Sequence, residues 1–289
     1  MADISARITR KSLAAKRKAA IKTIKAQAKE KIREVKMEYN SNPERLKAKE
    51  AEREQKKALR LQKANARLAY NARQPRQYTL GEDIFNSVSH GIGAGLSVAA
   101  IVLLIIKAAL HTPSEFNKSV IITGVTLFGS SMFVLYLFST LYHAITALTA
   151  RRVFSVFNHN AIYLLLAGTA TPYILTLVPA EARLLSFILV WSITLVFIVL
   201  YSVFGARLRS FSVFTYIVIG LALTIAFGFS SLSAPLNTFS RVMLLLGCAV
   251  YLVGGIFFFM RKYKWTHCIF HMFVIAGSIL HFFSVYYIF

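Results

Sequence analysis

The fold is decided by the last apolar stretch of the chain, which reads Trp265-Thr-His-Cys-Ile-Phe-His-Met-Phe-Val-Ile-Ala-Gly-Ser-Ile-Leu-His281. It is apolar enough to span a bilayer, yet it carries three histidines. His267 and His271 are four residues apart, so on a helix their imidazoles lie on one face. Ionisable side chains inside a membrane span are costly and indicate a functional site by default. The stretch therefore predicts a membrane helix with two ligands of a zinc site, or histidines that only pack between helices.

Hydropathy and charge divide the chain into two parts. The mean hydropathy is +0.55 and 56% of the residues are hydrophobic, which is unlike an ordinary soluble domain. Residues 1–80 hold 23 of the 34 Lys and Arg and 8 of the 12 Asp and Glu. From about Ile84 the chain becomes a series of apolar runs. We therefore expect a basic cytoplasmic tail over residues 1–80 and a membrane domain over residues 81–289. The two cysteines, Cys248 and Cys268, do not indicate a disulfide framework.

The basic tail is expected to be helical or disordered, with an interruption near Asn40-Ser-Asn-Pro43. Glu30, Glu34 and Glu38 recur at helical spacing among lysines, which supports a helix through i,i+4 pairs. One interpretation is a solvated tail without a partner. The leading functional interpretation is attraction to anionic lipid head groups, or to a cytoplasmic partner, because clustered basic residues beside a span are drawn to the inner leaflet. Nucleic-acid contact rests on charge alone, and neither an aromatic platform nor a known motif supports it.

After a predicted hinge at Gln74-Pro75-Arg76, the apolar runs predict an all-α fold with a seven-transmembrane helix bundle. The spans cover approximately residues 86–107, 118–145, 158–178, 184–204, 210–230, 239–260 and 265–287. Each is close to or above the roughly 20 residues that cross the hydrocarbon core. The chain is thus expected to be a multi-pass protein of the cell membrane.

The charges of the connecting loops predict the orientation of the bundle. One set of loops carries most of the basic residues, at Arg151, Arg152, Arg207, Arg209, Arg261, Lys262 and Lys264. The opposite set has basic residues only at the ends of spans. The positive-inside rule then places the N-terminus in the cytoplasm and the C-terminus outside.

This orientation gathers most of the polar side chains with ligand chemistry at the cytoplasmic face. His143 ends the second span there, and His267 and His271 begin the seventh span there. Three histidines leave the fourth tetrahedral position of a zinc ion (Zn²⁺) open, which is the pattern of a catalytic site. Zinc in that position would activate water and polarise a carbonyl. Ser139, one turn before His143, would either orient that water or a ligand, or bond a carbonyl of its own helix.

Four segments in separate spans resemble the haemolysin III family. They are Glu82-Asp-Ile-Phe-Asn86-Ser-Val-Ser-His90-Gly, Ser139-Thr-Leu-Tyr-His143, Asn158-His-Asn-Ala-Ile-Tyr-Leu-Leu-Leu-Ala-Gly168-Thr-Ala-Thr-Pro172 and His267-Cys-Ile-Phe-His271-Met-Phe-Val-Ile-Ala-Gly-Ser-Ile-Leu-His281. That family is related to the adiponectin and progestin receptors and, more distantly, to alkaline ceramidases. The resemblance covers about residues 80–289 and does not include the basic tail. It implies a seven-span protein with zinc held by His143, His267 and His271, and with Ser139 beside them.

One residue departs from the pattern of that family. Asn158 stands where the family usually has an aspartate, the candidate for activating the zinc-bound water in the related receptors and ceramidases. An asparagine can hydrogen-bond a water but cannot take its proton. Glu82 and Asp83 are the acidic residues of the membrane domain on that side, and neither is expected to substitute.

Three functions follow from these observations as alternatives. The first is a metal-dependent hydrolase of a lipid amide or ester, the chemistry that the wider superfamily resembles, with Ser139 and Asn158 beside the metal. The second is a zinc-stabilised sensor of membrane lipid without catalysis. The third is a pore-forming haemolysin, the activity for which the bacterial branch is named, although short loops and seven spans are unlike a released toxin. Imidazoles also bind other divalent metals, so zinc is an expectation from ligand type.

Overall fold

The computed structural model describes residues 2–39, 41–72, 78–229, 236–260 and 263–288. Within these residues the chain is helical and contains no strand. It divides into two compact units, Met1–Asn71 and Ala72–Phe289. The predicted hinge at residues 74–76 lies outside the described residues, as do Arg261 and Lys262 of the last basic loop.

The N-terminal unit consists of two helices, α1 (Ala2–Glu38) and α2 (Pro43–Ala72). Their break falls where the sequence predicts an interruption. The Asn42 side chain accepts a hydrogen bond from the Arg45 backbone N–H at 3.1 Å, which caps the start of α2. Arg33 of α1 forms an ion pair with Glu50 of α2 at 2.8 Å. The charged, alanine-rich sequence is therefore helical over its described length, with exposed charges on both helices.

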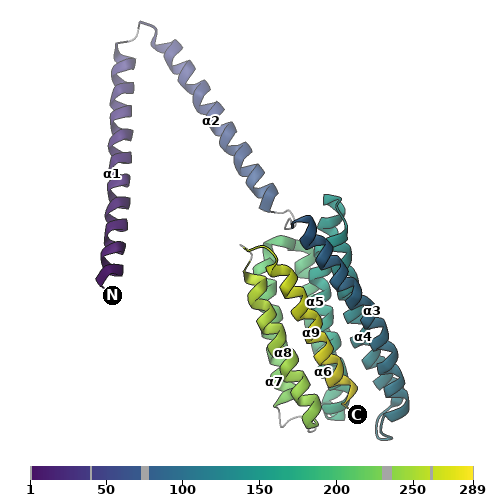
Figure 1. The fold of residues 1–289 in the computed structure, drawn as a ribbon. Helices are drawn as coiled ribbons and strands as arrows, with labels where there is room; N and C mark the ends of the chain where they lie inside the picture. Colours follow the sequence, from purple (N-terminus) through teal and green to yellow (C-terminus); the bar gives the residue numbers. More distant parts are fainter. Residues whose placement is uncertain (1, 40, 73–77, 230–235, 261–262, 289) are drawn as a thin grey trace. The chain divides into compact units, whose positions relative to one another are not determined.

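The second unit contains, among the described residues, seven helices that are long and apolar enough to cross a membrane (Figure 1). They are α3 (Leu80–His111), α4 (Lys118–Ala144), α5 (Leu148–Leu177), α6 (Ala180–Phe204), α7 (Arg209–Gly228), α8 (Thr238–Phe259) and α9 (Thr266–Tyr286). A short 3₁₀ turn, η1 (Gly205–Leu208), joins α6 to α7. The predicted all-α class and the seven spans are confirmed.

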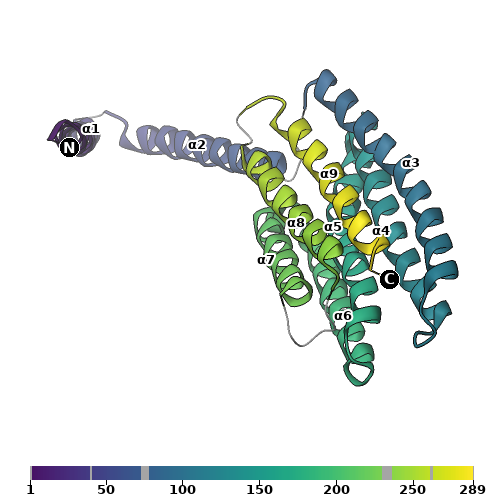
Figure 2. The same ribbon diagram turned by 60° about the horizontal axis from the view of Figure 1, so that its bottom comes forward.

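Six of these helices form a ring, and the remaining helix, α6, packs outside it. Helices α3, α4 and α5 pack in series, α9 returns against α3, and α8 and α7 lead back to α5. Helix α6 packs mainly on α5 and is the least buried of the seven. Figures 1 and 2 show α9 between α8 and α3. The last helix of the chain is thereby placed beside the first apolar one.

Two spans begin earlier than the apolar pattern predicts. Helix α3 begins at Leu80 because Thr79 and Glu82 form a reciprocal capping box, with the Glu82 N–H donating to the Thr79 hydroxyl at 3.3 Å and the Thr79 N–H donating to the Glu82 carboxylate at 2.9 Å. Helix α5 begins at Leu148 and includes Arg151, which is buried and paired with Asp83 at 2.5 Å. A charged turn predicted as loop is thus part of a packed helix, because its charge is neutralised within the bundle.

Buried tyrosines tie α9 to three other helices. The hydroxyl groups of Tyr136 in α4 and Tyr251 in α8 both bond the Ser278 hydroxyl, at 2.6 and 2.7 Å. Tyr173 in α5 donates to the Ser284 hydroxyl at 2.6 Å. Buried polar groups are costly unless they are paired, so these bonds set the rotation and height of α9 in the bundle.

Candidate metal centre

Three buried histidines meet at one end of the bundle. His143 ends α4, and His267 and His271 lie in the first two turns of α9. Each offers one ring nitrogen, and the three nitrogens lie within 4.8 Å of one another. The Nε2 atoms of His267 and His271 are 3.1 Å apart. Two nitrogens on one tetrahedral zinc ion, at about 2.0–2.1 Å each, would lie roughly 3.3 Å apart. The structure thus brings together the three predicted ligands in a spacing that suits a metal ion.

A carboxylate behind His143 sets the direction of its ring. The Oδ1 atom of Asp83 lies 2.9 Å from His143 Nδ1 and 2.5 Å from the Arg151 guanidinium. Because a carboxylate accepts, it holds the proton of His143 on Nδ1 and leaves the lone pair on Nε2. Nε2 is buried and has no hydrogen-bond partner among the described residues. This carboxylate–histidine pair is the arrangement that orients ligands in metal sites, so the residues present fit a metal ion.

Asp83 is the residue of the site whose role sequence reasoning does not anticipate. From the sequence, Asp83 is considered only as a replacement for the aspartate missing at Asn158, whereas the structure places it on the far side of His143. A signal is present in the heptad-like spacing of Asp83, Asn86 and His90, which lie on one face of α3. Asn86 and His90 are buried and Asp83 is partly buried, so this polar face is turned into the bundle.

Two further aromatic rings enclose the histidines. The ring of His90 stacks on His271 with centroids 3.8 Å apart. Tyr78, which lies directly before α3, stacks on His267 with centroids 4.8 Å apart. The Arg151 guanidinium lies 5.9 Å from the centre of the Tyr78 ring. Tyr78 before α3 and His90 within α3 therefore cover the rings of the three histidines.

The starts of α3 and α9 are joined through Glu82. One carboxylate oxygen of Glu82 accepts from the Thr79 backbone, and the other accepts from the Trp265 N–H at 2.8 Å. Trp265 has a φ of 65°, in the left-handed region that a bulky residue rarely adopts. The bond from Glu82 thus holds a strained residue directly before the helix that carries His267 and His271, and Glu82 itself is 4% exposed.

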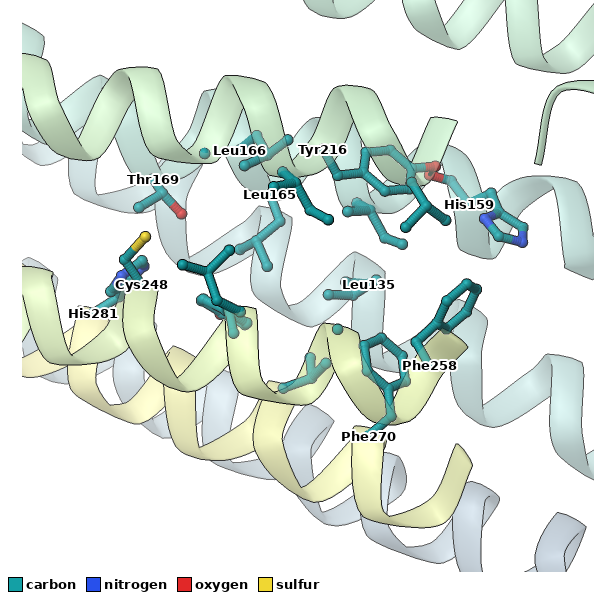
Figure 3. A pocket seen from close by; sticks show the side chains of 18 of the residues that line it. Leu135, His159, Leu165, Leu166, Thr169, Tyr216, Cys248, Phe258, Phe270 and His281 are labelled. Carbon is teal, nitrogen blue, oxygen red and sulfur yellow. Dashed lines mark hydrogen bonds between the residues drawn. The ribbon is translucent and has the colours of Figure 1, made fainter. Parts of the chain in front are cut away.

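A cavity of about 220 Å³ extends from the histidines between the helices. Side chains from α4, α5, α7, α8 and α9 line it, and most of them are apolar. The predicted site residues Ser139 and Asn158 line it together with His267 and His271, and the Ser139 hydroxyl is buried without a hydrogen-bond partner. Figure 3 shows the apolar middle of the cavity, around Leu135. Among its described lining residues there is no aspartate or glutamate.

Comparison with known proteins agrees with the motifs. A model of the haemolysin-III related family matches residues 78–282. The chain belongs to the haemolysin III family. The matched segment contains every residue of the metal centre described above and excludes α1 and α2.

Two haemolysin III relatives from bacilli resemble the chain over nearly their whole length. The protein "Hemolysin-3 homolog" of Bacillus subtilis (strain 168) is 38% identical over 208 residues, which are 72% of this chain and 94% of that protein. The protein "Hemolysin-3" of Bacillus cereus is 36% identical over 204 residues, 71% of this chain and 90% of that protein. The family identified from the four motifs is confirmed.

Proposed function

We propose that this haemolysin III family member is an integral membrane zinc protein that binds a long-chain lipid amide or ester and cleaves it at the three histidines. The observation that carries this proposal is the position of the three ring nitrogens at one end of a long, mostly apolar cavity. An acyl chain in that cavity would place the amide or ester carbonyl beside the metal centre. Apolar pockets with a few convergent polar groups are typical ligand sites.

The roles of the side chains follow from their positions. Zinc held by His143, His267 and His271 would supply a Lewis acid for the carbonyl and an activated water. Asp83 keeps the His143 ring in one orientation and one tautomer. The Ser139 hydroxyl and the Asn158 amide offer hydrogen bonds to the ligand at the same end of the cavity. Tyr78 covers the ring of His267 and keeps bulk water from the centre.

A lipid sensor is the second candidate, and one observation favours it. Asn158 and the absence of a carboxylate among the described cavity-lining residues leave the centre without an acidic side chain that takes a proton from water. Such a centre would hold a lipid carbonyl and release the lipid unchanged. The two candidates share the metal and the ligand and differ in turnover.

Metal content and turnover separate these candidates. We expect about one zinc per chain in the purified, full-length protein by elemental mass spectrometry, and none in His271→Ala. Release of fatty acid from long-chain N-acyl amides should be slow in the wild type. A base placed at the centre by Asn158→Asp should raise the rate, by up to about 10²–10⁴-fold. Zinc without turnover in either form would exclude the hydrolase and favour the sensor, and absence of metal from the wild type would exclude both.

The pore-forming alternative draws on the name of the Bacillus cereus relative, Hemolysin-3. Ion-conducting paths are lined by polar groups or backbone carbonyls, whereas the cavity of this bundle has mostly apolar walls. Dye release from liposomes at a defined protein density, beside heat-inactivated protein, tests this alternative. Release only with the native protein would favour a pore over a closed lipid site.

A further inference from the structure

The cavity has a second polar end, which the proposed hydrolysis does not use. Cys248 of α8, His281 of α9 and Thr169 of α5 line it there. Figure 3 shows these three side chains at one end of the cavity, with His159 and Phe258 at the other. His271 and His281 both lie on the continuous helix α9, so their separation of ten residue positions places the two ends about 15 Å apart.

His281 is a buried imidazole with an unused ring nitrogen. Its side chain is 8% exposed, and its Nε2 atom has no hydrogen-bond partner among the described residues. With the proton of the neutral imidazole on Nδ1, Nε2 presents a lone pair that can accept a hydrogen bond.

The neighbouring residues are shaped around this imidazole. A side chain at Gly247 would place its Cβ 2.6 Å from Nε2, so only glycine leaves room for the ring. The Tyr251 ring packs edge-on against His281 with centroids 5.2 Å apart. The Cys248 thiol is free, and the Thr169 side chain is partly buried. A lone-pair acceptor, a hydroxyl and a thiol thus meet at the end of an apolar cavity, where a polar atom without a partner is costly.

We propose that this far end is a second recognition subsite, which hydrogen-bonds a hydroxyl group at the remote end of the ligand's acyl chain. This inference rests on the proposed function in one respect, because it takes the other polar group of the ligand to lie at the three histidines. The His281 Nε2 atom accepts from the ligand hydroxyl, and Thr169 lies beside it as a second hydrogen-bonding group. The ligand class is therefore a long-chain amide or ester with a terminal hydroxyl, in place of a chain that ends in a methyl group.

The test compares two ligands that differ only at the remote end. Both are N-acyl amides with a saturated chain of about twelve carbons, long enough for the ~15 Å between the ends. One chain ends in methyl and the other in hydroxyl. Affinity is measured by competition with a fluorescent long-chain amide, using the full-length, zinc-loaded protein in nanodiscs and subtracting empty nanodiscs. The variants are His281→Phe and Thr169→Val, and Thr126→Val is the control, since the Thr126 hydroxyl bonds only the Ile122 carbonyl of its own helix at 2.7 Å.

The wild type and the control should bind the hydroxyl-ended amide about three- to tenfold more tightly than the methyl-ended one, as expected for one buried hydrogen bond. His281→Phe should abolish this preference and Thr169→Val should reduce it, while the zinc content of both variants stays unchanged. If His281→Phe misfolds and loses zinc, the relative affinity of Thr169→Val for the two amides decides whether the subsite exists.

Equal affinity for both amides in the wild type would overturn the proposal, as would a preference that survives in both folded variants or failure of either amide to bind. A wild type that hydrolyses the amides and contains zinc but binds both amides equally would reject the subsite alone. A preference without hydrolysis would reject the hydrolase and keep the subsite.

Discussion

The two ends of the cavity place histidines in different surroundings. At the metal-centre end, His143 is held by Asp83, Asp83 is held by Arg151, and the rings of Tyr78 and His90 cover the ligands. At the far end, the Nε2 atom of His281 has no hydrogen-bond partner among the described residues, and the ring packs where a side chain at Gly247 would clash with it.

The difference between the two ends indicates which kind of ligand each end can bind. A metal ion demands ligand atoms at fixed positions, and outer hydrogen bonds supply that fixity. A hydrogen-bonding group of a ligand needs an acceptor without a partner, and Gly247 leaves the room in which the His281 ring sits. Under these two proposals, histidine would serve as a metal ligand oriented by a carboxylate at the end of α4 and as a hydrogen-bond acceptor near the end of α9.

The sharpest test of this contrast is removal of one histidine from each end. His143→Ala should abolish metal binding, because it removes one of the three proposed ligands and the ring that Asp83 orients. His281→Ala should keep about one zinc per chain. Elemental mass spectrometry of both purified variants gives the answer. Equal metal loss in the two would show that the ends do not differ in function.

The second-largest effect on metal binding is expected from Asp83, whose carboxylate contacts His143 Nδ1. Asp83→Asn keeps the size of the side chain but weakens its hold on the His143 ring, and should lower zinc affinity about 10–100-fold. Competition with a zinc chelator at constant pH measures that affinity. Glu115→Gln, an exposed acidic residue in the α3–α4 loop, is the matched control and should bind zinc like the wild type. An unchanged zinc affinity in Asp83→Asn would contradict the proposal that Asp83 orients the His143 ring for metal binding.

A smaller effect is expected where α3 and α9 are joined. Glu82→Ala leaves the Thr79 and Trp265 N–H groups without their acceptor, and should lower the free energy of unfolding by about 1–3 kcal/mol. Thermal unfolding in detergent, followed by helical circular dichroism, measures the change beside Glu115→Ala. A loss no larger than that of the exposed control would mean that the two helix starts do not depend on this bond.

The smallest expected effect on the metal centre comes from the N-terminal unit. Deletion of residues 1–74 should leave zinc content unchanged, because every described residue of the centre lies between Tyr78 and His271. The same deletion should weaken binding to vesicles with anionic lipid and spare binding to zwitterionic ones, since we propose that the basic helices face the cytoplasmic leaflet. Sedimentation with vesicles of each composition tests this. Loss of zinc on deletion would contradict the independence of the two units.

The parts of the structure that were predictable from sequence are those with a local signature. Seven apolar runs predict seven helices, and the four-residue spacing of His267 and His271 places both on one face of α9. The loop charges add His143 to the same end of the bundle. The predicted ligands therefore depend on span length, periodicity and topology, which a single sequence contains.

The remaining features depend on contacts between residues that are distant in sequence. Asp83 and His143 are 60 positions apart and Asp83 and Arg151 are 68 apart, so no local pattern joins them. Pairing with Asp83 also explains why α5 begins before its apolar run, since Arg151 alone reads as a loop residue. The far end of the cavity also has no local sequence signature, because its lining residues Thr169, Cys248 and His281 come from three helices.

The bond between Glu82 and Trp265 has a consequence for biosynthesis. A ribosome makes α3 first and α9 last among the seven apolar helices, so a nascent chain that has inserted six of them still lacks two of the three histidines. The Glu82 carboxylate at the start of α3 can accept its hydrogen bond from the Trp265 N–H only after the chain has been synthesised as far as the start of α9. If the three histidines bind a metal as proposed, only a chain that includes α9 can bind it, because a prematurely terminated chain contains His143 and Asp83 but not His267 and His271.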